Sequence, residues 1–163
     1  MLSHLLAFAL LMMPDAVADQ TVKVTPDSAK LTTIMIDDMT FTARTIQFKS
    51  DNGSKKCTLE GDAKVKFGDI TITADRIQSN GNLELESLVC TGNCTWKQED
   101  GSGEVFSGDN LEFRQDGLRL TGNASLRYRS NDHITVITCD SISAILGNEG
   151  YEFSGAVRLR HGN

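Results

Sequence analysis

Proline and aromatic residues are scarce in this 163-residue chain. The only two prolines, Pro14 and Pro26, lie near its start, so any later β-ladder has its full set of backbone donors. Aromatic residues make up 6% of the sequence and never alternate with Lys or Arg in a run. The sequence therefore offers no platform on which nucleic-acid bases could stack.

An excess of positive charge is also missing. The chain has 16 basic and 22 acidic side chains, which gives a formal net charge of −6. This balance offers no electrostatic footprint for nucleic acid or for an anionic membrane surface. We expect no nucleic-acid partner.

Catalytic motifs are absent as well. The sequence contains no nucleophile elbow, phosphate-binding loop or metal-binding helix motif. The acidic residues Asp38, Asp69, Asp75, Asp109 and Asp140 recur with the repeat described below, which is typical of turn or outer-face positions and not of two carboxylates facing each other across a cleft. We predict that the protein is not an enzyme and needs no cofactor.

Long hydrophobic runs are limited to Leu5–Met13. This run is about half as long as the roughly 20 residues of a transmembrane helix, and it is followed by Pro14 and the small-residue pattern Ala16–Ala18. Residues 1–18 are therefore predicted to be a signal peptide, with a retained anchor as the alternative. Residues 19–163 suffice for one domain with its own core.

Export affects how the four cysteines are interpreted. In an oxidising compartment, Cys57, Cys90, Cys94 and Cys139 could form two disulfides in three possible pairings. In an extended strand Cys90 and Cys94 lie about 13 Å apart, too far to share a metal ion without a bend. We predict structural roles for the cysteines and no metal site.

The sequence repeats itself with a period of about 31 residues. Residues 38–47 match 69–78 almost letter for letter, and residues 105–111 and 134–142 are weaker relatives. A second landmark centres on glycines spaced 31, 30 and 33 residues apart. These glycines are Gly61, Gly92, Gly122 and Gly155. Two landmarks that keep the same period indicate four to five copies of one strand-turn-strand unit.

Within each unit, apolar and polar residues alternate. Ala63, Val65 and Phe67 alternate with charged neighbours, which predicts strands with one apolar and one wet face. A glycine inside such a pattern allows a bulge or a bend. Bends at the same level of every unit would curve the sheet, and its apolar face must then be covered by another sheet, a partner or a ligand.

These residues resemble the LptA/OstA-like family of lipopolysaccharide transport proteins. The signature is carried by residues 59–65 followed by 69–77, by 108–113 and by 120–142, and the resemblance covers roughly residues 34–159. It implies an all-β fold, an open, twisted and mostly antiparallel β-jellyroll shaped like a folded taco. It also implies a periplasmic carrier that holds the acyl chains of lipopolysaccharide or a related glycolipid between two sheets. The implied partners are jellyroll domains of the inner- and outer-membrane transport components, together with head-to-tail copies of the chain.

Shielding is physically necessary for such a cargo, because each methylene that leaves water gains about 0.8 kcal/mol. The candidate lining consists of apolar residues in the inward phase of the repeat. For any single one of them core packing is the more common role, and only the set as a whole indicates a groove. The candidates are Met39, Phe41, Val65, Phe67, Ile70, Ile72, Trp96, Phe106, Leu111, Phe113, Leu126 and Ile137. The last predicted strand, Tyr151–Arg160, could extend a neighbour's sheet.

Three alternatives remain open at this point. A structural or scaffolding β-repeat protein would have a tightly filled interior. An anchored partner resembling LptC would retain its leader. A sugar-active repeat enzyme would require a cluster of carboxylates in a surface groove.

Overall fold

The computed structural model describes residues 20–24, 30–51, 54–79, 87–99, 103–114, 116–130, 133–145 and 150–162. The predicted signal peptide lies outside these residues. No helix that could span a bilayer occurs among the described residues. The strands are β1 (Gln20–Val24), β2 (Thr32–Ile36), β3 (Met39–Ala43), β4 (Thr45–Asp51), β5 (Ser54–Phe67), β6 (Ile70–Ser79), β7 (Ser87–Gln98), β8 (Val105–Arg114), β9 (Gly117–Ser130), β10 (His133–Ile145), β11 (Tyr151–Ser154) and β12 (Arg158–Gly162).

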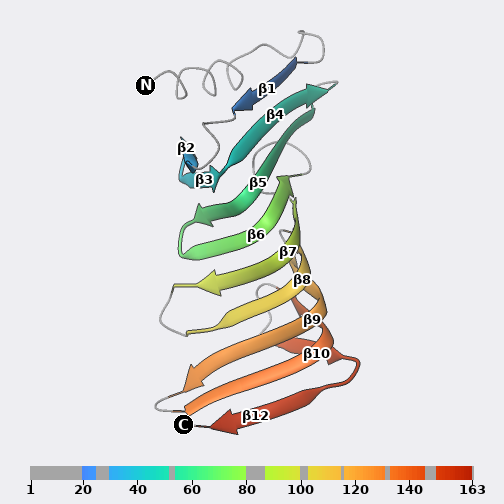
Figure 1. Ribbon diagram of the computed structural model, residues 1–163. Coiled ribbons are helices and arrows are strands. Elements are labelled where there is room, and N and C mark those ends of the chain that lie inside the picture. The colour runs from blue at the N-terminus through green and yellow to red at the C-terminus, as the bar shows by residue number, and fades with distance from the viewer. Residues whose placement is uncertain are drawn as a thin grey trace.

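All twelve strands belong to one antiparallel sheet. From β4 to β11, consecutive strands are hydrogen-bonded neighbours, and β1 pairs with β4 at the start of the path. β3 pairs with both β2 and β5, and β12 pairs with β10. The path begins at β1 and ends at β11 without closing, so the sheet is open (Figure 1). The predicted all-β, open and antiparallel architecture is confirmed.

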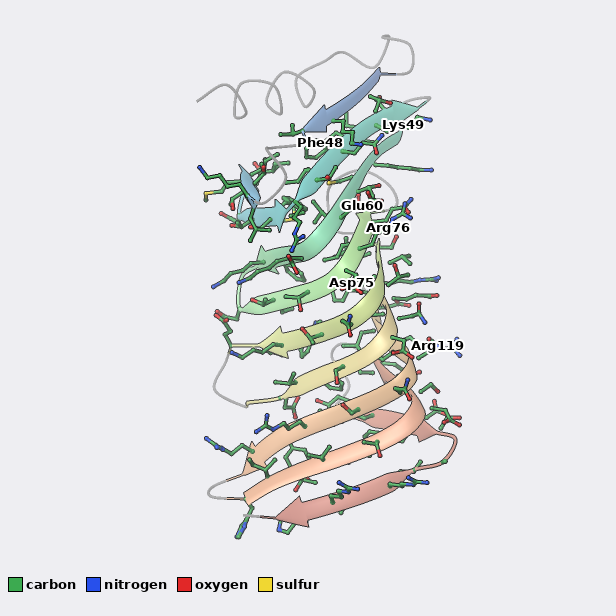
Figure 2. The ribbon with its side chains drawn as sticks, in the orientation of Figure 1. Phe48, Lys49, Glu60, Asp75, Arg76 and Arg119 are labelled. Atoms are coloured by element: carbon green, nitrogen blue, oxygen red, sulfur yellow. The ribbon has the colours of Figure 1, made fainter. Side chains whose placement is uncertain are left out.

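The sheet is folded into two layers, because each long strand bends near its middle. Layer A contains β1, β4 and β11, and layer B contains β2, β3 and β12. Each of the strands β5 to β10 contributes one half to each layer. Figure 1 shows the strands stacked one below another and curving along one side of the molecule. Figure 2 labels Glu60, Asp75 and Arg76 near this line of curvature.

The bends coincide with the recurring glycines. In β9, Gly122 and Asn123 both adopt left-handed backbone conformations, with φ of 73° and 49°, and the pairing of β8 with β9 shifts at this point, between Ser107 and Asn110. The same two-residue geometry recurs in β5 and β7. A left-handed conformation costs an ordinary residue about 1–2 kcal/mol. The predicted bulge is confirmed, and it explains why glycine recurs.

Two of the recurring aspartates, Asp75 and Asp109, cover the bends at Gly92 and Gly122, whereas Asp38 and Asp69 lie in turns. Asp109 lies directly over Gly122, where an added Cβ would be 2.6 Å from its Oδ2, and the same oxygen accepts a hydrogen bond of 2.9 Å from Asn123 Nδ2. Asp75 accepts an equivalent bond from Asn93. In the first unit the roles are reversed, because Arg44 donates to Asp62. One interstrand polar contact thus stabilises each of these bends on its outer side.

Gly122→Ala is predicted to destabilise the protein by about 1–2 kcal/mol from the left-handed conformation alone, with a further penalty from the contact with Asp109. Gly150→Ala is the matched control, because an added Cβ there meets nothing within 4 Å and its φ is not left-handed. The free energy of unfolding in urea measures both effects. An equal loss in the two variants would contradict the proposed role of the bend.

Candidate lipid-binding interior

The inner face of layer B carries an unbroken apolar row that crosses every one of its strands. Its members are directly opposed in successive ladders. In ladder order they are Ile34, Phe41, Val65, Ile72, Trp96, Phe106, Leu126, Ile137 and Leu159. Seven of the twelve predicted lining residues lie in this row. The 31-residue period places the same kind of side chain at the same level of each strand pair.

The remaining candidates also face inward. Met39, Phe67 and Ile70 are opposed to one another one step closer to the open ends of the layer B strands, and all three are half-buried. Leu111 and Phe113 lie on layer A. Their ladder neighbours there form a second apolar surface, which includes Leu59, Ile77, Cys90, Leu120 and Ile142. All of the predicted residues share one interior.

The two layers pack on each other through aromatic side chains. Phe67 of layer B lies 5.6 Å, between ring centroids, from Phe113 of layer A, and Phe106 lies 5.3 Å from Tyr151. The Tyr151 hydroxyl also donates a 2.7 Å hydrogen bond to Glu104 Oε2. Eight of the candidate residues are buried, and the other four are half-buried. Most of the interior is therefore covered by the protein's own side chains.

The cover is lost at the C-terminal end of the interior. Along the layer B row, Leu126 is 2% exposed, its neighbour Ile137 is half-buried, and Leu159 on the terminal strand β12 is 65% exposed. The aromatic contacts explain this exposure. Phe67 on the layer B half of β5 meets Phe113 on the layer A half of β8, and Phe106 on the layer B half of β8 meets Tyr151 on β11. The two layers are therefore displaced relative to each other along the order of the strands. β10 and β12 lie at the end of this diagonal arrangement, where layer A has no strand beyond β11 in the described sheet.

One polar atom within the interior has no partner. The indole Nε1 of Trp96 is buried, and no acceptor among the described residues is within hydrogen-bonding distance. Trp96 packs edge-on against Phe106, with 5.3 Å between ring centroids. A buried donor without an acceptor costs about 1–3 kcal/mol. The free donor distinguishes this position from the wholly apolar members of the row.

The four cysteines line the same interior as free thiols. Burial raises the pKa of Cys57 to about 12 and that of Cys94 to about 11. Burial likewise raises the pKa values of Cys90 and Cys139. Cys90 and Cys94 lie on either side of the bend at Gly92 and Asn93. Among the described residues no group of three potential metal ligands occurs.

The sequence interpretation missed several residues of this interior. Leu159 is the fourth residue after Gly155, as Val65, Trp96 and Leu126 are after their own glycines, so extending that column would have identified it. Tyr151 gave no such signal, because its contacts with Phe106 and Glu104 depend on how the layers fold onto each other.

Fold and interior together define an open antiparallel β-jellyroll with an apolar interior between its layers. Residues 40–145 match the sequence model of the family described as LptA/(LptD N-terminal domain) LPS transport protein. The chain belongs to this family of lipopolysaccharide transport proteins. No curated protein matches the sequence.

A solved structure supports the same fold. The LptA-homologous periplasmic component LptH of the lipopolysaccharide transport device of Pseudomonas aeruginosa superposes with a TM-score of 0.64 at 12% sequence identity. The match covers 75% of this chain and 93% of that one. At this identity the likeness shows a shared fold, the jellyroll that the family resemblance implied.

Leu126→Ala is predicted to destabilise the protein by about 2–5 kcal/mol, because it leaves a cavity in a packed interior. Leu159→Ala, the same change in the same row, should stay within about 0.5 kcal/mol, since Leu159 is largely exposed. Urea unfolding of both variants tests the difference in cover. Comparable losses would mean that the C-terminal end of the row is as well packed as its middle.

The thiols should react very slowly with iodoacetamide at pH 8 in the folded protein, because burial and raised pKa values leave almost no accessible thiolate. After unfolding in denaturant without a reductant, all four cysteines should be labelled. Intact mass spectrometry counts the added groups. Two or fewer additions to the unfolded chain would show that disulfides form in place of free thiols.

Proposed function

We propose that the protein is a periplasmic carrier that shields the acyl chains of lipopolysaccharide, or of a related glycolipid, during transit between the inner and outer membranes. The observation that carries this proposal is the apolar row that crosses every strand of layer B and emerges uncovered at Leu159. Family membership supports the same class of cargo.

Acyl chains gain access at the end where the interior is already uncovered. The largely exposed Leu159 and the half-buried Ile137 provide apolar surface there. Deeper binding requires the two layers to part, which replaces contacts such as that between Phe106 and Tyr151 with contacts to the lipid. Because both states bury apolar surface, this exchange can be nearly neutral while the lipid gains about 0.8 kcal/mol per shielded methylene.

Trp96 supplies a point of polar recognition along this path. Its unpaired N–H lies in the middle of the row, and an ester or hydroxyl oxygen of an acylated sugar is a suitable acceptor. Hydrogen bonding to the ligand would remove the penalty of the unsatisfied buried donor.

The ends of the sheet are suited to assembly with other jellyrolls. In the described sheet β12 pairs only with β10, and β1 pairs only with β4, so each has an edge that another strand can extend. At the N-terminal end the chain passes from β1 in layer A to β2 in layer B, and at the C-terminal end it passes from β11 in layer A to β12 in layer B. Head-to-tail stacking of copies, or of membrane-component jellyrolls, would therefore place β11 and β12 of one domain parallel to β1 and β2 of the next and continue the apolar row.

A scaffolding role is the second candidate, and the filled interior favours it. A scaffold of this kind would assemble through its edges without taking up lipid. The two functions differ in what touches the inner face of β10 and β12.

A photo-crosslinking residue in place of Leu159 or Ile137 is predicted to capture lipopolysaccharide in living cells. The same probe in place of Glu152 is the matched control, because Glu152 is exposed on the terminal strand β11 and faces outward. Immunoblotting for lipopolysaccharide adducts provides the readout. If protein adducts form but neither inward probe ever captures lipid, the carrier proposal fails and the scaffolding role is supported.

A further inference from the structure

The outer face of layer B lacks negative charge along two complete rows. The row closer to the bend contains Thr33, Thr42, Lys64, Thr73, Thr95, Ser107, Ser125, Thr138 and Arg158. The row farther from it contains Met35, Thr40, Lys66, Thr71, Lys97, Val105, Arg127, Val136 and Arg160. Six of these side chains are basic and none is acidic, although the whole chain carries a net charge of −6.

The repeat itself generates this pattern. Lys66, Lys97, Arg127 and Arg160 are each the fifth residue after a bend glycine, so one cation appears in every second strand of the same row. Neither row contains an acidic residue, whereas Asp75 lies at a bend and Asp69 in a turn. The overall charge therefore conceals a basic face.

Basic residues are most concentrated at the C-terminal end of this face. Two arginines on each side flank the half-buried Val136 of β10. They are Arg127 and Arg129 on β9, and Arg158 and Arg160 on β12. We call these four residues the arginine patch. From strand geometry, Arg127 and Arg160 are about 10 Å apart at their Cα atoms, and Arg127 and Arg129 about 7 Å. All four side chains are exposed, and none forms an ion pair with a described carboxylate.

Four unpaired guanidinium groups at this spacing repel one another, so a bound anion would stabilise the arrangement. Arginine suits phosphate, because its planar fork donates two parallel hydrogen bonds to phosphate oxygens. Elsewhere on the same face, Lys66 has its own partner, Glu99, at 3.2 Å. The arginine patch is thus the part of the face that is best prepared for an external anion.

The edge strand β12 combines this patch with the uncovered end of the interior. Arg158 and Arg160 point to the outer face, whereas Leu159 between them belongs to the inner apolar row. Cations and exposed apolar surface therefore meet across the thickness of one strand. A purely acidic protein partner would use the cations but leave Leu159 unexplained, while a molecule with both an anionic head and acyl chains can use both sides.

We propose that the arginine patch binds the phosphate groups of the headgroup of an acylated glycolipid whose chains lie on Ile137 and Leu159. This inference rests on the proposed carrier function and adds to it a second contact, which selects phosphorylated lipid. It also gives the cargo an orientation, with its head outside the β12 edge and its tails inside.

The test compares Arg127→Gln/Arg129→Gln with the unaltered protein. Both substitutions are on β9, inside the sheet, so the edge of β12 keeps its backbone geometry. Lys64→Gln/Lys97→Gln is the matched control, because it removes two positive charges from the same outer face far from Leu159. The probes are purified lipopolysaccharide and the same preparation after enzymatic dephosphorylation, and thermal melting confirms that each variant is folded.

The unaltered protein and the lysine control should bind the phosphorylated probe roughly tenfold more tightly than the dephosphorylated one, as expected for charge-assisted hydrogen bonds at an exposed site. The arginine variant should lose this preference, keep its affinity for the dephosphorylated probe, and show a weaker dependence on salt.

Three outcomes would overturn the inference while leaving the carrier function intact. The arginine variant could retain the preference, it could lose only self-association, or inorganic phosphate could bind the patch without affecting capture of the lipid. If the unaltered protein captures neither probe, the carrier proposal itself fails.

Discussion

The rest of the architecture depends on the outer contact at each bend. Where Asp109 covers Gly122 and accepts a hydrogen bond from Asn123, two successive residues are held in the left-handed region, and the strand turns from one layer into the other. Because the unit repeats, the bends lie along one line and the sheet folds as a whole. Without them, the same alternating strands would form one twisted sheet whose apolar face is uncovered.

Much of this could be predicted from sequence because the determinants are local and periodic. The period of two sets which side chains face inward, and the glycine column sets where the strands bend. Contacts between the layers depend on how far one layer is displaced relative to the other. The pairing of Phe67 with Phe113 and the exposure of Leu159 are results of that displacement, and no local pattern encodes them.

Net charge was a poor guide to the surface for a related reason. A sum over the chain discards position, whereas a repeat places like residues in the same row. Lys66, Lys97 and Arg127 are unremarkable as members of an acidic sequence, but the ladders align them on one face without a carboxylate in their row. In a repeat protein, the charge summed along each row of aligned residues therefore describes the surface better than the net charge of the whole chain.

A filled interior and a carrier function are compatible if binding proceeds from an edge. A preformed cavity lined by apolar side chains would lower the stability of the unloaded protein, since each lost contact and void costs free energy. A packed interior whose apolar row is uncovered at its described C-terminal end would avoid that cost, because on the proposed route the first methylenes would contact Ile137 and Leu159 there. Under the proposed carrier function, each further contact would exchange protein packing for lipid packing, so that the layers would part stepwise and close again behind the cargo.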